Sequence, residues 1–277
     1  MGAAADGEQG GLSNTSIIMT SSSPMRTPAS ELNEILLERY LGALGITELV
    51  RIAQEEKAGK LSGLFLPAVD DAYLESKVRV MLIGQETRGW GKGLGKLAAQ
   101  EHTLQTLRTY VQAQMDVYRK FSPTAPAKSR FRQFHDKLHA SLAMHVAVDR
   151  RAVFWGNLLC LSLNGGSPRK ASEMEAIAAI SKKLLAIQFE VLSPDLVVFG
   201  TGYGYDKFLR NQIGAYTTLP GLKPRHYWPF EVHHPRFKAW RVRHPRRLTV
   251  DIKQELLRAV LSCAALHAAD NQMAVAY

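Results

Sequence analysis

Polar side chains suited to acid-base or hydrogen-bonding chemistry follow the apolar runs of this sequence. Gln85 and Glu86 come directly after the first run, Asn157 follows the second, and His244 follows a later stretch of alternating residues. A carboxylate can stabilise positive charge or orient water, an amide can read a hydrogen-bonding edge, and a histidine can donate to a developing anion. These side chains form a candidate site if the fold brings the ends of the runs together.

The apolar runs predict buried strands. Residues 77–84, 152–155 and 196–199 are nearly all apolar, which is typical of parallel strands covered on both faces, and residues 226–244 alternate like further strands. Helical spacing predicts helices at 30–41 with Ser30 as N-cap, and at 98–121, 131–143, 172–191, 205–210 and 250–266. We therefore expect an α/β fold with three layers, α/β/α, around a mostly parallel sheet of four strands. The carboxyl ends of such strands share one edge of the sheet, where ligands bind.

Composition limits the class of protein. Residues 1–29 are rich in Gly, Ala, Ser and Thr and predict a disordered tail, whereas residues 30–277 predict a single domain. Hydrophobic residues make up 46% of the chain, which excludes a disordered or fibrous protein. No apolar run approaches the ~18 residues of a membrane span, so we expect no membrane partner.

Cysteine usage indicates the compartment. Cys160 and Cys263 are too few and too far apart for a disulfide framework or a four-thiolate metal site. The histidines at 226, 233, 234 and 244 are crowded with arginine, which disfavours a zinc site. We therefore predict an intracellular, cytoplasmic protein that uses no metal and no other cofactor.

Basic residues are concentrated near the C-terminal end. The chain has 35 Lys and Arg against 25 Asp and Glu, a net charge of +10, and residues 223–248 hold eight basic residues against the single acid Glu231. Aromatic residues are interleaved with them: Tyr227, Trp228, Phe230, Phe237 and Trp240. Cations neutralise phosphates and aromatic faces stack on unpaired bases, so this stretch favours a nucleic-acid partner. The alternative is a solvated cationic edge with its aromatic residues in the core.

Two glycine-rich segments resemble phosphate-binding motifs. Gly89–Lys96 is similar to a P-loop, but Trp90 stands at a required glycine and Leu97 replaces the Ser or Thr that would hold magnesium. Gly200–Gly204 resembles the glycine turn of dinucleotide folds or of methyltransferases that use S-adenosylmethionine, although it comes late in the chain. A tight turn at a strand end is the favoured interpretation, and a nucleotide-handling transferase stays open as a hypothesis.

In their order along the chain, the strand-end residues resemble the uracil-DNA glycosylase superfamily. That family carries Gly-Gln-Asp-Pro or Gly-Glu-Ala-Pro after its first strand, an asparagine after its second, and His-Pro-Ser followed by leucine near its end. Residues 84–86 (Gly-Gln-Glu) resemble the first motif, Asn157 resembles the second, and residues 244–248 (His-Pro-Arg-Arg-Leu) resemble the third. The resemblance extends from about residue 77 to residue 265.

The resemblance implies a monofunctional, metal-free DNA glycosylase. Such an enzyme cleaves the N-glycosidic bond of uracil, or of a related damaged base, that has been flipped out of DNA. The implied catalytic residues are Glu86, beside the sugar and its attacking water, and His244, which donates to the departing base. The other implied roles are base binding by Gln85, Asn157 and Trp90, phosphate binding by Arg243, Arg246 and Arg247, and wedging by Leu248.

The sequence departs from the family pattern at several positions. Thr87 stands where the family has proline, and Arg246 replaces the serine of the third motif. The four cysteines of the iron–sulfur branch of the family are missing. His234-Pro235 is a competing match to the third motif, but Lys238 occupies its leucine position, which favours His244. A protein of this fold that binds nucleic acid without cutting it is the alternative function.

Overall fold

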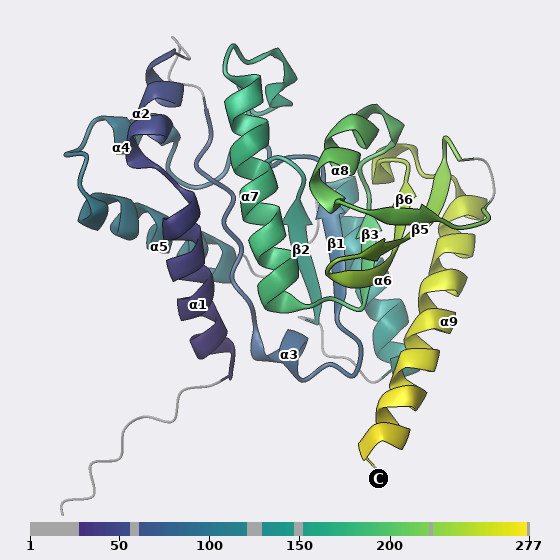
Figure 1. The fold of residues 1–277 in the computed structure, drawn as a ribbon. Helices are drawn as coiled ribbons and strands as arrows, with labels where there is room; N and C mark the ends of the chain where they lie inside the picture. Colours follow the sequence, from purple (N-terminus) through teal and green to yellow (C-terminus); the bar gives the residue numbers. More distant parts are fainter. Residues whose placement is uncertain (1–27, 56–60, 121–128, 147–151, 222–223, 276–277) are drawn as a thin grey trace, which may run out of the picture.

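A computed structural model describes residues 28–55, 61–120, 129–146, 152–221 and 224–275 (Figure 1). The strands belong to one six-stranded mixed sheet with the order β2-β1-β3-β6-β5-β4. Its parallel part comprises β2 (Val153–Asn157), β1 (Val80–Gly84), β3 (Leu196–Phe199) and β6 (Arg236–Val242). Two further strands, β5 (Tyr227–His233) and β4 (Tyr216–Thr218), continue the sheet with antiparallel pairing.

The predicted α/β class is confirmed, but the predicted total of four strands was wrong. Residues 226–244 form two strands, and only the second of them, β6, joins the parallel part of the sheet. The edge strand β4 was missed because three residues, Tyr-Thr-Thr, carry too little pattern to be recognised.

Helices lie on both faces of the sheet. They are α1 (Pro28–Ala43), α2 (Ile46–Glu55), α3 (Asp71–Leu74), α4 (Leu94–Ala98), α5 (Leu104–Lys120), α6 (Arg130–Val146), α7 (Met174–Leu192), α8 (Asp206–Ile213) and α9 (Val250–Val275), with short 3₁₀ turns η1 (Pro168–Lys170), η2 (Tyr203–Tyr205) and η3 (Pro245–Arg247). No helix in these ranges combines the length and the apolar character needed to cross a membrane. The cellular compartment stays a prediction.

Alternate residues of each parallel strand contribute to two apolar cores. In β1, Met81 and Ile83 pack with α1 and α7, whereas Val80 and Leu82 pack with α6 and α9. Figure 1 shows α7 in front of the parallel strands and α6 behind them. Because both faces are covered, the strands contain hardly any polar residues until they reach their carboxyl ends.

The N-terminal boundary differs from the prediction. Helix α1 begins at Pro28, so the tail boundary at residue 29 and the N-cap at Ser30 were both wrong. Proline is favoured in the first turn, where its missing N–H costs no hydrogen bond. The backbone N–H of Ala29 donates to the Asp71 carboxylate at 3.0 Å, a tertiary contact that the local sequence does not reveal. The rest of the predicted tail, residues 1–27, lies outside the described residues.

The single helix predicted at 98–121 is two helices. Helix α4 ends at Ala98 and α5 begins at Leu104. Between them, Thr103 accepts the backbone N–H of Thr106 on its Oγ1 at 3.1 Å, which caps the start of α5. The last helix, predicted at 250–266, extends further and ends at Val275 in α9. The other predicted helices and strands occur close to their predicted ranges.

Strand order reverses beside β1. The chain passes from β1 to β2 on one side and then crosses to β3 on the other side. Open α/β sheets place ligand sites beyond the carboxyl ends of the strands at such a reversal. The residues that follow β1 and β2 are therefore in the position where a ligand site is expected.

Candidate functional site

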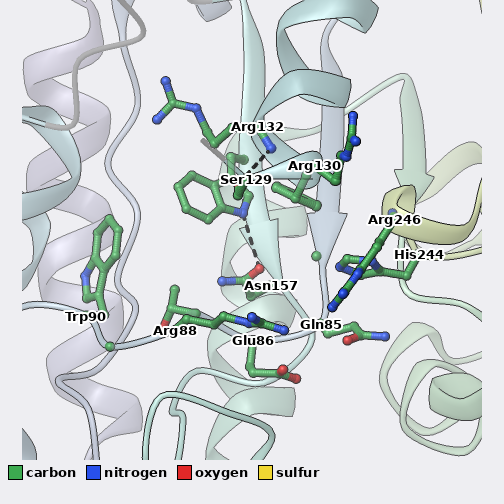
Figure 2. Close-up of a pocket in the computed structure, with 15 residues that line it drawn as sticks. Gln85, Glu86, Arg88, Trp90, Ser129, Arg130, Arg132, Asn157, His244 and Arg246 are labelled. Atoms are coloured by element: carbon green, nitrogen blue, oxygen red, sulfur yellow. Dashed lines mark hydrogen bonds between the residues drawn. The ribbon is translucent and has the colours of Figure 1, made fainter. Parts of the chain in front are cut away.

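A pocket of about 400 Å³ lies at the carboxyl ends of β1, β2 and β6 (Figure 2). Its walls are residues 84–90 after β1, the end of β2, residues 129–132 at the start of α6, and the segment that begins η3. The predicted site residues that line it are Gln85, Glu86, Trp90, Asn157, His244 and Arg246. The structure therefore brings the three predicted motifs to one cavity.

Asn157 presents a hydrogen-bond donor to this pocket. It ends β2 and is only 6% exposed. The indole N–H of Trp155 donates to its Oδ1 at 3.2 Å, the dashed line that ends on Asn157 in Figure 2. Because an indole nitrogen only donates, this bond fixes which end of the amide is oxygen. The buried Nδ2 has no hydrogen-bond partner among the described residues and is an unsatisfied donor at the pocket wall.

Gly84 makes room for the Asn157 amide. The two residues are paired across β1 and β2. A Cβ atom at position 84 would lie 2.4 Å from Oδ1 of Asn157 and 3.1 Å from Cε2 of Phe131. Any side chain at this position would displace the amide, so the first glycine of the motif is a packing requirement of the site.

His244 is held as a neutral donor. Its Nδ1 accepts the backbone N–H of Arg246 at 3.2 Å, so a neutral ring carries its proton on Nε2. Burial lowers the pKa of His244, and the charges of Arg88, Arg246 and Arg247 lower it further. The competing His234 lies in the turn between β5 and β6 and does not line the pocket.

Glu86 is anchored by a tyrosine that sequence reasoning missed. The buried Tyr205 donates its O–H to Oε2 of Glu86 at 2.6 Å, and the hydroxyl of Ser167 lies 2.8 Å from the same phenol oxygen. Burial raises the pKa of Glu86 above its ordinary value, and the hydrogen bond from Tyr205 is the largest effect that opposes this rise. The only sequence signal for Tyr205 was its place directly after the glycine turn that follows β3.

Tyr205→Phe is expected to raise the pKa of Glu86 further. The substitution keeps the ring but removes the hydrogen bond that favours the carboxylate, so the protonated form persists to higher pH. Carboxyl-carbon NMR titration of Glu86 measures the change, with Tyr216→Phe on β4 as a control that leaves the titration unchanged. An unaltered or lowered Glu86 pKa in Tyr205→Phe would contradict the assigned role.

The aromatic wall differs from the predicted one. Trp90 is 6% exposed and packs edge-on against Phe65, with ring centroids 4.8 Å apart. Trp155 and Phe131 also line the pocket, are more exposed than Trp90, and have centroids 5.6 Å apart. These two rings offer a ligand more surface, and the stacking role of Trp90 stays a prediction.

The pocket is cationic. Arg88, Arg130, Arg132 and Arg246 line it, whereas Glu86 is the only carboxylate among the lining residues that the structure describes. Arg130 and Arg132 come from the start of α6, where their positions depend on tertiary packing. Of these four arginines, the sequence prediction included only Arg246. An anionic ligand is favoured by this balance.

The other predicted DNA contacts lie outside the pocket. The Arg243 guanidinium is hydrogen-bonded to Nε2 of His226, and Arg247 is exposed at the end of η3. Leu248 is half-buried and packs against the core beneath α6 and α9. Its wedging role stays a prediction, as do the phosphate contacts of the two arginines.

The aromatic residues of the basic stretch are not available for stacking. Each is at most 5% exposed: Tyr227, Trp228, Phe230, Phe237 and Trp240. The interpretation of these rings as base-stacking surfaces was wrong, because β5 and β6 are covered on both faces. The side chains that point to either face of these strands are therefore buried. Arg241 of the same stretch is also buried and pairs with Asp206 at 2.8 Å.

The glycine turn after β3 packs against the third motif. A Cβ atom at Gly202 would lie 3.3 Å from the backbone nitrogen of His244. The turn itself does not line the pocket, which favours its interpretation as a tight turn.

In the described ranges, no three His, Cys, Asp or Glu side chains are grouped closely enough to hold a metal ion.

Fold and pocket together define an α/β protein with a cationic, donor-rich ligand site at the carboxyl edge of its parallel strands. No model of a known protein family matches the sequence, and a search of curated proteins finds no match.

Proposed function

We propose that this protein is a hydrolase of the uracil-DNA glycosylase type, which cleaves the N-glycosidic bond of uracil or a related damaged base flipped out of DNA. The observation that carries this proposal is the meeting of Glu86, Asn157 and His244, which are far apart in sequence, in one cationic pocket. The parallel order β2-β1-β3-β6 inside the larger sheet supports a glycosylase-like arrangement of these motifs.

Glu86 acts on the sugar and on the attacking water. Cleavage of the bond builds positive charge on the sugar, which a carboxylate stabilises. Tyr205 holds Oε2, so Oε1 is the oxygen that orients water. Only the ionised carboxylate does this, so activity falls as the pH falls through the raised pKa of Glu86.

His244 acts on the departing base. Negative charge develops on the base as the bond breaks, and the Nε2–H of the neutral imidazole donates to a base oxygen. Because the low pKa of His244 keeps the ring neutral, the pocket needs no proton transfer to prepare this donor. The surrounding arginines add positive potential that favours the anionic leaving group.

Asn157 selects the base through its fixed amide. Nδ2 donates to a carbonyl oxygen, as uracil presents, and meets a second donor where cytosine presents its amino group. A buried donor facing a donor leaves both groups unsatisfied, which is more costly than the loss of one hydrogen bond. The pocket therefore favours bases that present oxygen to Asn157.

Trp155→Phe is expected to reduce discrimination between uracil and cytosine by about tenfold, the value of one satisfied buried hydrogen bond. The substitution keeps an aromatic ring but removes the N–H that orients Asn157. Binding of oligonucleotides that carry one uncleavable 2′-fluoroarabino-uridine or -cytidine measures the ratio. An unchanged ratio in Trp155→Phe would show that the amide is oriented by other contacts.

A panel of oligonucleotides tests the function itself. Each carries one modified base, and alkali cleaves the strand wherever a base has been released. Strand cleavage at uracil or at a related base supports the proposal. Absence of cleavage throughout the panel, with salt-sensitive DNA binding intact, would overturn catalysis and leave a nucleic-acid-binding protein of this fold.

A further inference from the structure

An exposed aromatic and cationic surface lies beside the pocket, where β3 and β6 end. It consists of Tyr203, Arg225, Arg243 and Arg247, and we call it the Tyr203 surface. Tyr203 is 47% exposed, in contrast to the buried aromatic residues of β5 and β6. It lies within the glycine turn after β3, outside the basic stretch whose rings were expected to face solvent.

Arg225 orients the Tyr203 ring. Its guanidinium carbon lies 4.3 Å from the ring centroid, and its Nη2 donates to the phenol oxygen at 2.9 Å. The guanidinium covers one face of the ring, and the side chain as a whole remains largely exposed. This arrangement leaves a flat aromatic surface open to a second planar group.

Positive charge surrounds this ring. The pKa of Tyr203 is lowered first by the hydrogen bond from Arg225 and by its charge, and then by Arg247 and Arg243, so both of these lie close enough to act on the phenol. Within the described part of the chain, none of the three arginines forms an ion pair with a carboxylate; Arg243 instead bonds His226. Uncompensated arginines around an aromatic face match a ligand that has both phosphates and bases.

A backbone contact and neighbouring residues of the chain link the Tyr203 surface to the pocket. The backbone N–H of Gly202 donates to the carbonyl of Val242 at 2.8 Å, which holds the turn against the end of β6. Arg246 lines the pocket, and its neighbour Arg247 acts on Tyr203. A strand with one nucleotide in the pocket can therefore extend onto this surface.

We propose that the Tyr203 surface binds an unpaired stretch of a DNA strand, with a base stacked on Tyr203 and phosphates held by Arg225, Arg243 and Arg247. The stack then has three planar layers: guanidinium, phenol ring and base. Duplex DNA keeps its base faces covered, so the surface prefers single-stranded DNA. This binding goes beyond the proposed function, because it requires neither a base in the pocket nor a cleavage step.

Fluorescence anisotropy with the full chain tests the proposal. The probes are a labelled deoxythymidine oligomer and an abasic oligomer of equal length and charge, neither of which contains uracil. Tyr203→Ala is expected to weaken binding of the thymidine oligomer about tenfold, and to change binding of the abasic oligomer less than about twofold. Tyr203→Phe keeps the ring and binds both oligomers within about twofold of the unmodified protein.

The charges are tested by salt titration. Arg225→Ala is expected to reduce the slope of log affinity against log salt by about 0.7, the value of one phosphate contact on a single strand. Arg39→Ala is the control, because it removes one exposed arginine of α1 that pairs with Glu190 and does not belong to the Tyr203 surface, and it is expected to leave the slope unchanged.

Two results would overturn the proposal. One is a Tyr203→Ala protein that still prefers the thymidine oligomer to the abasic one as strongly as the unmodified protein does. The other is an Arg39→Ala protein that loses as much slope as Arg225→Ala. If no base is released but the expected effects of Tyr203→Ala and Arg225→Ala on binding are observed, the glycosylase function is excluded and the Tyr203 surface is supported. If base is released but these effects on binding are absent, the glycosylase function is supported and the Tyr203 surface is excluded.

Discussion

Glu86→Gln is expected to slow base release by about 10²- to 10⁴-fold, the range for a group that acts directly at the reacting bond. Glutamine keeps the size of the side chain, and Tyr205 can still donate to its amide oxygen. The negative charge is lost, and none of the other described residues that line the pocket is a carboxylate that could replace it. The reaction therefore loses both the stabilisation of the sugar cation and the orientation of water.

Single-turnover rates on a uracil-containing oligonucleotide, with enzyme in excess, measure this effect without interference from product release. Glu190→Gln is a matched control, because Glu190 is an exposed carboxylate on α7 that pairs with Arg39. Binding of uncleaved DNA is expected to persist in Glu86→Gln. A rate within a factor of ten of the unmodified protein would exclude Glu86 as the catalytic carboxylate.

His244→Ala is expected to slow base release by about 10²- to 10³-fold. This is the range observed when other enzymes lose one hydrogen-bond donor to a developing oxyanion. The Nε2–H that faces the departing base is lost, whereas the arginines of the pocket still provide diffuse positive potential. A donor aligned with the oxygen contributes more than a distant charge, because its geometry is fixed before the reaction begins.

His234→Ala separates the two candidate histidines of the third motif. His234 lies in the hairpin turn outside the pocket, so its removal is expected to leave the rate unchanged. His244→Gln restores a side-chain donor and is expected to recover part of the rate lost in His244→Ala. Equal losses in His234→Ala and His244→Ala would contradict the assignment of the motif to residues 244–248.

The parallel strands and one side of the pocket could be predicted from the sequence. Apolar runs locate β1, β2 and β3 because strands covered on both faces contain almost no polar residues. Polar residues such as Glu86 and Asn157 then stand out at the points where each run ends. Their convergence follows from the geometry of parallel strands, which place all their carboxyl ends at one edge.

The partners that orient these residues could not be predicted. Tyr205 reaches Glu86 only because the turn after β3 folds back toward the loop after β1. Trp155 belongs to an apolar run, and nothing in that run distinguishes a ring that donates to Asn157 from one that only packs. The arginines at the start of α6 reach the pocket through the packing of a helix on a sheet, which local spacing does not encode.

The basic stretch shows why composition alone was misleading. Its alternation of arginine and aromatic residues is compatible with an exposed, base-stacking ribbon or with a covered hairpin. The choice depends on whether helices cover both faces of β5 and β6, which is a property of the whole sheet. Arg241 illustrates the outcome, because its charge is satisfied inside the protein by Asp206.

The two walls of the pocket are attached to different apolar cores. Tyr205, which holds Glu86, belongs to the core beneath α1 and α7, whereas Phe131 packs on the core shared by α6 and α9. Local opening of the α6 and α9 layer would move Phe131 and the arginines of α6, whereas Trp155 on β2 and the hydrogen bond to Glu86 would stay in place. Under the proposed function, a bulky base would therefore widen the pocket on its α6 side, where Phe131 packs, without breaking the hydrogen bond that holds Glu86 on the other core.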